Sequence, residues 1–225
     1  MTKTYILSID PANKSLAISF FSYNNNYNND IKEELKKKEL NYLKLINIDK
    51  ILNNIIDIKY MDVIDLFPDI KVIDINILDR TNLFKLNILN INKMIFKYIE
   101  EFNINEIIVC IEYQPVFNNK SNVVFNQLIY EYSCNKIFNI QIMYPVLKNK
   151  IYFHPLLKHK EFISKYNNLY IANKMHTREN FLYFIKIFNL EKDIKHIQKK
   201  NLDDISDTFL QSIAYLKFIK KCFNN

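Results

Sequence analysis

The sequence predicts an α/β protein in which helices flank a five-stranded mixed sheet. Short β-branched runs of strand length alternate with longer segments whose apolar residues recur at helical spacing, and such alternation is typical of α/β folds. A chain of 225 residues, 49% of them hydrophobic, can bury one sizeable core. We therefore expect a single domain over residues 1–225, with an extended or inserted region around residues 24–80.

The first two strands are expected to form a hairpin. Residues 4–10 are apolar enough for a buried strand, residues 11–14 can turn the chain, and residues 16–21 return as a second strand. Apolar and polar residues alternate over 41–79 until Pro68 interrupts them. One or two strands are therefore expected there, including the third strand of the main sheet.

The later elements alternate along the chain. Helical spacing over residues 81–102 predicts a helix that crosses from the third strand to a β-branched strand at 107–112. The remaining expected elements are a helix over 118–138, a strand over 140–146, and helices over 173–188 and 202–223. The expected order is three strands, a helix, a strand, a helix, a strand and two helices. This is the order of an RNase H-like fold.

Four carboxylates lie where one metal-dependent chemistry would need them. Asp10 ends the first strand and Glu112 ends the strand at 107–112, which places both at the carboxyl edge of the sheet. Asp204 and Asp207 are one helical turn apart and share a face of the last helix. Oxygen ligands without Cys or His suit Mg²⁺, and two such ions can activate a water for phosphodiester cleavage. These four acids are the candidate catalytic and metal-binding residues.

Each carboxylate also has a plainer interpretation. Acids that end strands are common in turns, and Asn201 could cap the last helix with Asp204 in its first turn. Asp207 lies beyond that turn, so capping does not account for it. Asp203 is expected to face away from the group, and it is the alternative to Asp204 as a ligand.

The positive charge of the chain is concentrated in one segment. Residues 148–200 contain 12 Lys and Arg against 4 Asp and Glu, a surplus of 8, so a net charge of +7 leaves the rest at about −1. Such a segment suits DNA, because phosphate contacts release counterions, although a solvated lysine-rich surface is the alternative. The four histidines lack metal-ligand spacing and are expected at the surface or on phosphates.

Six residues are candidate DNA contacts. Tyr113 and Phe117 follow Glu112 and could stack on an unpaired base, with packing at the core or its rim as the alternative. The basic candidates are Lys148, Lys150, Lys174 and Arg178.

Composition excludes several classes of protein. Three cysteines without metal spacing indicate a reducing, intracellular compartment. The first strand begins by residue 4, which leaves no room for a presequence, and no apolar run reaches the ~18 residues of a membrane span. The chain has no glycine, which argues against an actin-like ATPase with glycine-rich phosphate loops. Positions with φ > 0 must therefore fall on Asn, Asp or less tolerant residues.

Three motifs resemble those of the RuvC-like Holliday junction resolvases and occur in the same order along the chain. Within that family, the resemblance is to the poxvirus and fungal mitochondrial branch. Residues 6–15 read I-L-S-I-D-P-A-N-K-S and are similar to the first-strand signature of the family. Residues 111–115 resemble its I-E-x-Q segment, and residues 199–208 resemble the start of its last helix. Ser8 and Ala12 stand where the family usually has glycine, which affects the geometry of the turn rather than the carboxylates.

The resemblance implies a homodimeric endonuclease that nicks two opposed strands of a four-way DNA junction, in DNA recombination or in the resolution of viral concatemers. It implies two Mg²⁺ ions, with Mn²⁺ as a substitute, and Asp10 as the ligand that bridges them. The host cytoplasm of a virus fits better than a mitochondrion, given the missing presequence. Two alternatives stay open: another RNase H-like nuclease, such as an RNA–DNA hybrid ribonuclease, and a non-catalytic DNA-binding scaffold.

Overall fold

The structure, a computed structural model, describes residues 3–12, 15–25, 56–65, 77–114, 120–152, 158–187 and 190–220. The strands are β1 (Lys3–Pro11), β2 (Ser15–Asn24), β3 (Ile56–Asp65), β4 (Ile107–Glu112) and β5 (Phe138–Met143). The helices are α3 (Ile77–Phe102), α4 (Lys120–Ser133), α5 (Pro145–Lys148), α6 (His159–Ile163), α7 (Leu169–Ile187) and α8 (Leu202–Ala214), with a 3₁₀ turn at Lys199–Asn201 and a π turn at Tyr215–Ile219. Most of the region expected around 24–80 lies outside the described residues.

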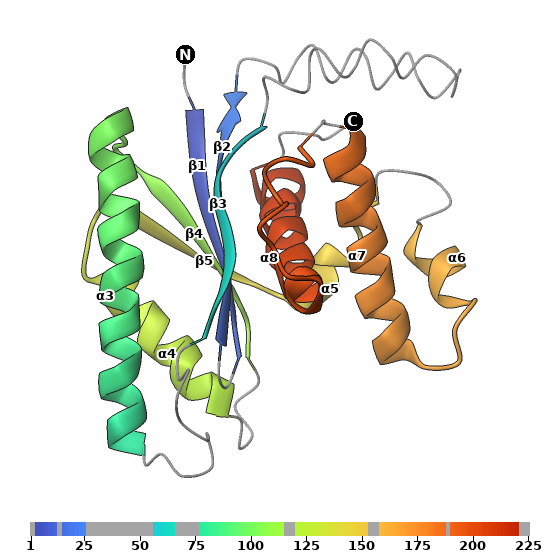
Figure 1. Cartoon of the computed structure of the whole chain (residues 1–225), viewed down its shortest axis with the longest axis horizontal. Coiled ribbons are helices and arrows are strands. Elements are labelled where there is room, and N and C mark those ends of the chain that lie inside the picture. The colour runs from blue at the N-terminus through green and yellow to red at the C-terminus, as the bar shows by residue number, and fades with distance from the viewer. Residues whose placement is uncertain are drawn as a thin grey trace.

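The five strands form one mixed sheet in the order β3-β2-β1-β4-β5, which confirms the predicted fold class. Strand β1 pairs antiparallel with β2 and parallel with β4, while β3 is antiparallel to β2 and β5 is parallel to β4. Helices α3 and α4 cover one face, and α8 covers the other with α5 and α7 beside it (Figure 1). The termini of β1 and β4 that carry Asp10 and Glu112 therefore meet at one edge of the sheet.

The central strands are continuous apolar runs because helices cover both of their faces. Every residue of β4 from Ile107 to Glu112 is buried. Successive side chains point to opposite faces, so that Ile108 joins the core under α8 whereas Val109 joins the core under α3 and α4. A short β-branched run buried on both sides is what the sequence pattern at 107–112 predicts.

Helix α8 is the most deeply buried helix among those described. All of its residues from Ile205 to Ala214 are buried, because the sheet covers one side and α7 and α5 cover the other. The apolar side of the helix faces the sheet, where the Phe209 ring lies 5.6 Å from the ring of Phe21. The opposite side is buried as well.

The buried polar residues of α8 are compatible with this burial because their side chains find main-chain acceptors. Ser206, Thr208 and Ser212 each donate to a carbonyl oxygen about one turn earlier, at 2.6, 2.9 and 3.3 Å. Gln211 Nε2 donates to the carbonyl oxygen of Cys110 in β4 at 2.9 Å, which ties the helix directly to the sheet. These bonds lower the cost of placing hydroxyl and amide groups in the core.

Small side chains on the sheet make room for α8. Ser8 pairs with Ser19 in β2 and with Cys110 in β4, and all three side chains are fully buried on the face that α8 covers. In a chain without glycine, serine and cysteine are among the smallest residues that can fill these positions. Ser8, which departs from the family signature, therefore suits the close approach of the helix.

The missing glycine also determines how α3 ends. Asn103 has φ of 49°, the one positive value among the described residues, and it follows the last residue of the helix. The Ile104 amide donates to Ile99 O at 3.0 Å and the Asn103 amide donates to Glu100 O at 3.4 Å, the bonds of a Schellman motif. Asparagine tolerates the left-handed conformation better than most residues, as the composition predicts.

Several predicted boundaries differ from the observed ones. Helix α4 ends at Ser133 rather than at 138, and β5 starts at Phe138 rather than at 140. Pro145 begins the short helix α5 instead of interrupting a strand, because proline is well tolerated in the first turn of a helix. Helix α6 was not predicted. No described helix combines the length and apolar character that crossing a membrane requires.

Replacing Phe209 with alanine should lower the free energy of unfolding by roughly 3–5 kcal/mol, because the cavity would open at the centre of the core. The ring is fully buried and lies 5.3 and 4.7 Å from the rings of Phe181 and Phe184. Urea unfolding followed by circular dichroism measures the change. Leu89→Ala on α3, where the side chain is 55% exposed, should change stability by about 0.5 kcal/mol or less; equal losses would contradict the assignment of the core.

Candidate active site

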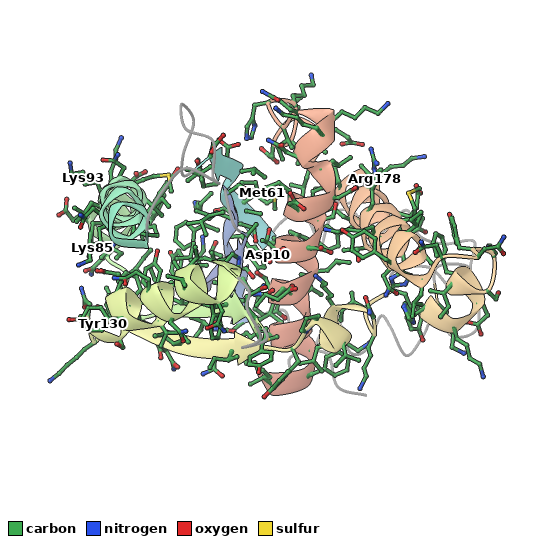
Figure 2. The ribbon with its side chains drawn as sticks, turned by 90° about the horizontal axis from the view of Figure 1, so that it is seen from below. Asp10, Met61, Lys85, Lys93, Tyr130 and Arg178 are labelled. Atoms are coloured by element: carbon green, nitrogen blue, oxygen red, sulfur yellow. The ribbon has the colours of Figure 1, made fainter. Side chains whose placement is uncertain are left out.

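The sheet brings Asp10 and Glu112 together. Ile9 in β1 is the register partner of Ile111 in the parallel strand β4, and the two acids are the next residue of each strand. Both side chains point to the face that α8 covers, because they alternate with Ile9 and Ile111, which belong to the opposite core. Figure 2 shows Asp10 at the boundary between the sheet and α8.

Helix α8 supplies the other two acids from its first two turns. Asp204 and Asp207 are three residues apart, so their side chains share one face of the helix. The predicted group of four carboxylates is therefore drawn from β1, β4 and α8.

Two lysines lie among these carboxylates. Lys148, the last residue of α5, donates to Glu112 Oε2 at 2.8 Å and lies 3.2 Å from Asp207 Oδ2. Lys174 on α7 donates to Asp204 Oδ1 at 3.2 Å and to Asp207 Oδ2 at 2.9 Å. Asp207 is consequently bound by both ammonium groups, and the two lysines connect three of the four acids.

Most of this charge is removed from water. The side chains of Lys148 and Glu112 are each 11% exposed and that of Asp207 is 5% exposed, whereas Asp204 at 44% reaches solvent. Buried charges cost several kcal/mol each unless close partners compensate, and here the buried carboxylates of Glu112 and Asp207 each have an ammonium partner within 3.2 Å. Removing Lys148 would leave the buried carboxylate of Glu112 without this partner.

The carboxylates outnumber the ammonium groups by four to two, and the pKa values reflect this imbalance. Burial and the neighbouring charge of Glu112 raise the pKa of Asp10 well above the ordinary carboxyl value, against the opposing effect of Lys148. Burial also raises the pKa of Glu112, with a contribution from Asp207. Burial alone would lower the pKa of Lys148, but the surrounding carboxylates raise it, so the lysine stays charged.

The structure separates Asp204 from its neighbour Asp203. Asp203 Oδ1 lies 3.4 Å from Arg178 on α7, one turn beyond Lys174, while Asp204 shares Lys174 with Asp207. Asp203 is therefore directed away from the group, as predicted. The capping alternative is not supported, because Asn201 has helical backbone angles and its side chain makes no capping hydrogen bond.

The candidate DNA contacts are placed differently from one another. Lys150 is exposed just after α5. Arg178 is on α7, where Figure 2 labels it, and its partly buried side chain lies beside Asp203 of α8. Lys148 and Lys174 bind the carboxylates instead of presenting free ammonium groups. The ring of Tyr113 packs 6.0 and 5.3 Å from the rings of Phe125 and Tyr144, in line with the packing alternative. Phe117 lies outside the described residues.

The expectation for the histidines was wrong in one case. His176 is fully buried on α7, with its ring 4.9 Å from that of His159 and 5.6 Å from that of Phe162. His196 is exposed, as expected, with Nε2 2.7 Å from the carbonyl oxygen of Met61. His154 lies outside the described residues. A histidine at the interface of two helices has no distinct signature in a sequence.

The donor chemistry of the centre fits hard divalent cations. All candidate ligand atoms are carboxylate oxygens, and a bound cation would oppose the burial and the neighbouring negative charges that raise the pKa of Asp10. As the described side chains stand, no three His, Cys, Asp or Glu residues are close enough to hold one ion. The ammonium groups of Lys148 and Lys174 lie at the same oxygens that an ion would take.

Comparison with known proteins agrees with the class that this fold and acidic centre define, the RNase H-like fold. No protein-family model and no curated protein sequence matches the chain. Among solved structures, the chain is similar to Fowlpox virus resolvase in complex with its substrate Holliday junction DNA, with 15% identity, a TM-score of 0.53, and 95% of this chain and 97% of that chain covered. It is also similar to T. thermophilus RuvC in complex with a Holliday junction substrate, with 9% identity, a TM-score of 0.51, and 96% and 97% covered. The chain thus shares the fold of these two resolvases, which agrees with the resemblance of its motifs.

Replacing Asp10 with asparagine should stabilise the protein at pH 8 in EDTA, because it removes a charge that burial disfavours. The pKa of Asp10 is raised in the folded state. Between the ordinary carboxyl pKa and this raised pKa, the folded protein therefore keeps a proton that the unfolded chain has released. The free energy of unfolding must therefore fall as pH rises from the ordinary carboxyl pKa through the folded one. The advantage of the neutral asparagine should vanish near pH 4. Urea unfolding at both pH values measures it.

The control for this measurement is Asp193→Asn, at an exposed aspartate outside the carboxylate group. It should not reproduce the stabilisation. A less stable Asp10→Asn protein at pH 8 would show that the charge of Asp10 is well compensated by the lysines, contrary to the imbalance described above.

Proposed function

We propose that this chain is a metal-dependent endonuclease that resolves four-way DNA junctions by paired, symmetric nicks. The observation that carries the proposal is that Glu112 on β4 and Asp204 and Asp207 on α8 share the ammonium groups of Lys148 and Lys174, with Asp10 at the end of the neighbouring strand β1. A fold alone does not determine an activity, but two proteins with this fold were solved with Holliday junction DNA. The site and the fold therefore point to the same chemistry.

The four carboxylates are the proposed ligands of two Mg²⁺ ions, with Mn²⁺ as a substitute and Asp10 as the bridging ligand. When bound, such a pair activates a water and stabilises the leaving oxygen of the cleaved strand. The residues of the chain position these ligands: β1 and β4 hold Asp10 and Glu112 side by side, and the burial of Asp207 restricts its side chain to one place. Rigid, buried ligands favour a defined geometry for the reacting phosphate.

The proposed substrate interface is the basic segment between α5 and α8. The exposed lysines among its described residues are Lys150, Lys158, Lys160, Lys165, Lys186, Lys192, Lys195, Lys199 and Lys200. A group of exposed, positively charged side chains favours contacts with phosphates. Together with Arg178, Tyr113 and Phe117, these lysines are the proposed DNA contacts.

We also propose a homodimer, because paired cuts require two active sites. The proposed location is a reducing compartment such as the cytoplasm.

Purified protein should nick a labelled mobile four-way junction at symmetric positions in two opposed strands, with Mg²⁺ and not with EDTA. A linear duplex and an RNA–DNA hybrid of the same sequence should be cut much more slowly. Denaturing gels of each end-labelled strand locate the nicks. Preferential cutting of the hybrid would favour the hybrid ribonuclease, and junction binding without any cut would favour the non-catalytic scaffold.

A pair of neighbouring variants tests the ligand assignment. Asp204→Asn should lower the rate of junction cleavage by roughly 100-fold or more, since the bound ions contribute several kcal/mol to the reaction. Asp203→Asn, which removes the same charge from the adjacent position, should stay close to the unmutated rate because Asp203 faces Arg178. Single-turnover cleavage at saturating protein compares them. A greater loss from Asp203→Asn would reverse the assignment.

A further inference from the structure

The carboxylate oxygens of the proposed site already have cationic partners. Lys148 lies 2.8 Å from Glu112 Oε2 and 3.2 Å from Asp207 Oδ2, and Lys174 lies 2.9 Å from the same Asp207 oxygen and 3.2 Å from Asp204 Oδ1. Each ammonium group thus bridges two carboxylates that come from different elements or turns. This is the arrangement expected of a cation that holds acids together.

We propose that Lys148 and Lys174 are the resident counter-ions of the carboxylate centre, and that a divalent cation binds only as these ammonium groups leave the carboxylate oxygens. The inference rests on the proposed function, because it takes Glu112, Asp204 and Asp207 as metal ligands. It adds a step that controls loading: the free protein is held in a state with low affinity for the metal.

An ammonium group already occupies the carboxylate oxygen that a divalent ion would need. Lys148 and Lys174 both lie within 3.2 Å of Asp207 Oδ2, and a divalent ion at the same oxygen would lie within a few ångströms of them, where repulsion is strong in a buried environment. We therefore expect the lysine side chains to move when the metal enters.

DNA offers the displaced lysines a new partner. A phosphate is an anion that can accept an ammonium group once it has left its carboxylate, so the backbone of the substrate and the divalent cation should each strengthen the binding of the other. Such coupling would load the metal where a phosphodiester is present to be cleaved.

The two lysines differ in how readily they can move. Lys174 is 26% exposed and bonds to Asp204, which is 44% exposed, so this pair can separate into solvent. Lys148 is 11% exposed, and its partners Glu112 and Asp207 are 11% and 5% exposed. Lys148 should therefore oppose metal binding more strongly than Lys174.

Binding of Mn²⁺ to the folded protein without DNA tests the inference, with free Mn²⁺ measured by electron paramagnetic resonance. Lys148→Met keeps the length of the side chain and removes its charge, and it should tighten Mn²⁺ binding by about tenfold or more. Lys174→Met should tighten it less. Lys136→Met is the control, because this exposed lysine precedes β5 at the opposite end of the sheet and its loss changes the net charge equally.

Unchanged or weaker Mn²⁺ binding by both Lys148→Met and Lys174→Met would overturn the inference and leave the proposed function intact. Absence of Mn²⁺ binding in every variant and in the unmutated protein would overturn both, because the carboxylates would then not be ligands. Equal tightening by Lys136→Met would attribute the effect to net charge and would also overturn the inference.

A measurement on the unmutated protein does not depend on how the variants fold. Ammonium groups held in buried salt bridges exchange slowly enough to be observed in ¹⁵N-lysine spectra, so Lys148 and Lys174 should each give a resolved side-chain signal. Titration with Mg²⁺ should shift or remove both signals. Signals that persist unchanged at saturating Mg²⁺ would overturn the inference.

Discussion

The buried carboxylate of Asp207, bound by the ammonium groups of Lys148 and Lys174, is the contact on which the arrangement of the site depends. It joins α5, α7 and α8 at one atom, Asp207 Oδ2, which is 3.2 and 2.9 Å from the two nitrogens. Lys148 extends the connection to Glu112 at the end of β4. Because a buried charge is costly without partners, these three helices and the sheet are held in one relative position.

The architecture that permits this contact follows from the close packing of α8 on the sheet. Small buried side chains at Ser8, Ser19 and Cys110 let the helix approach, and the aromatic ring of Phe209 fills the space further along. The parallel pairing of β1 with β4 places Asp10 beside Glu112 under the first turns of the helix. Packing of the core and assembly of the acidic centre are thus two results of the same arrangement.

The elements that could be predicted are those with a strong local pattern. The run at 107–112 predicted a strand that is buried on both faces. The absence of glycine predicted that a positive φ would fall on Asn, Asp or a less tolerant residue, and it falls on Asn103. The short helices α5 and α6 could not be predicted, because helices of four and five residues are too short to show a repeating apolar pattern. The burial of α8 on its second face depended on α7, which lies earlier in the chain and has no local signal for that contact.

The sequence by itself determined which elements present the four candidate acids, since each acid is tied to the end of a strand or to helical spacing. It favoured Asp204 over Asp203 as a ligand and left Asp203 as the alternative. Only the tertiary structure decided that lysines, predicted as phosphate contacts, lie among those acids. The reason is physical: the lysines and their partners are 30 to 59 positions apart along the chain, from Lys174 and Asp204 to Lys148 and Asp207. Contacts over that separation are set by how helices pack, which no local pattern of residues encodes.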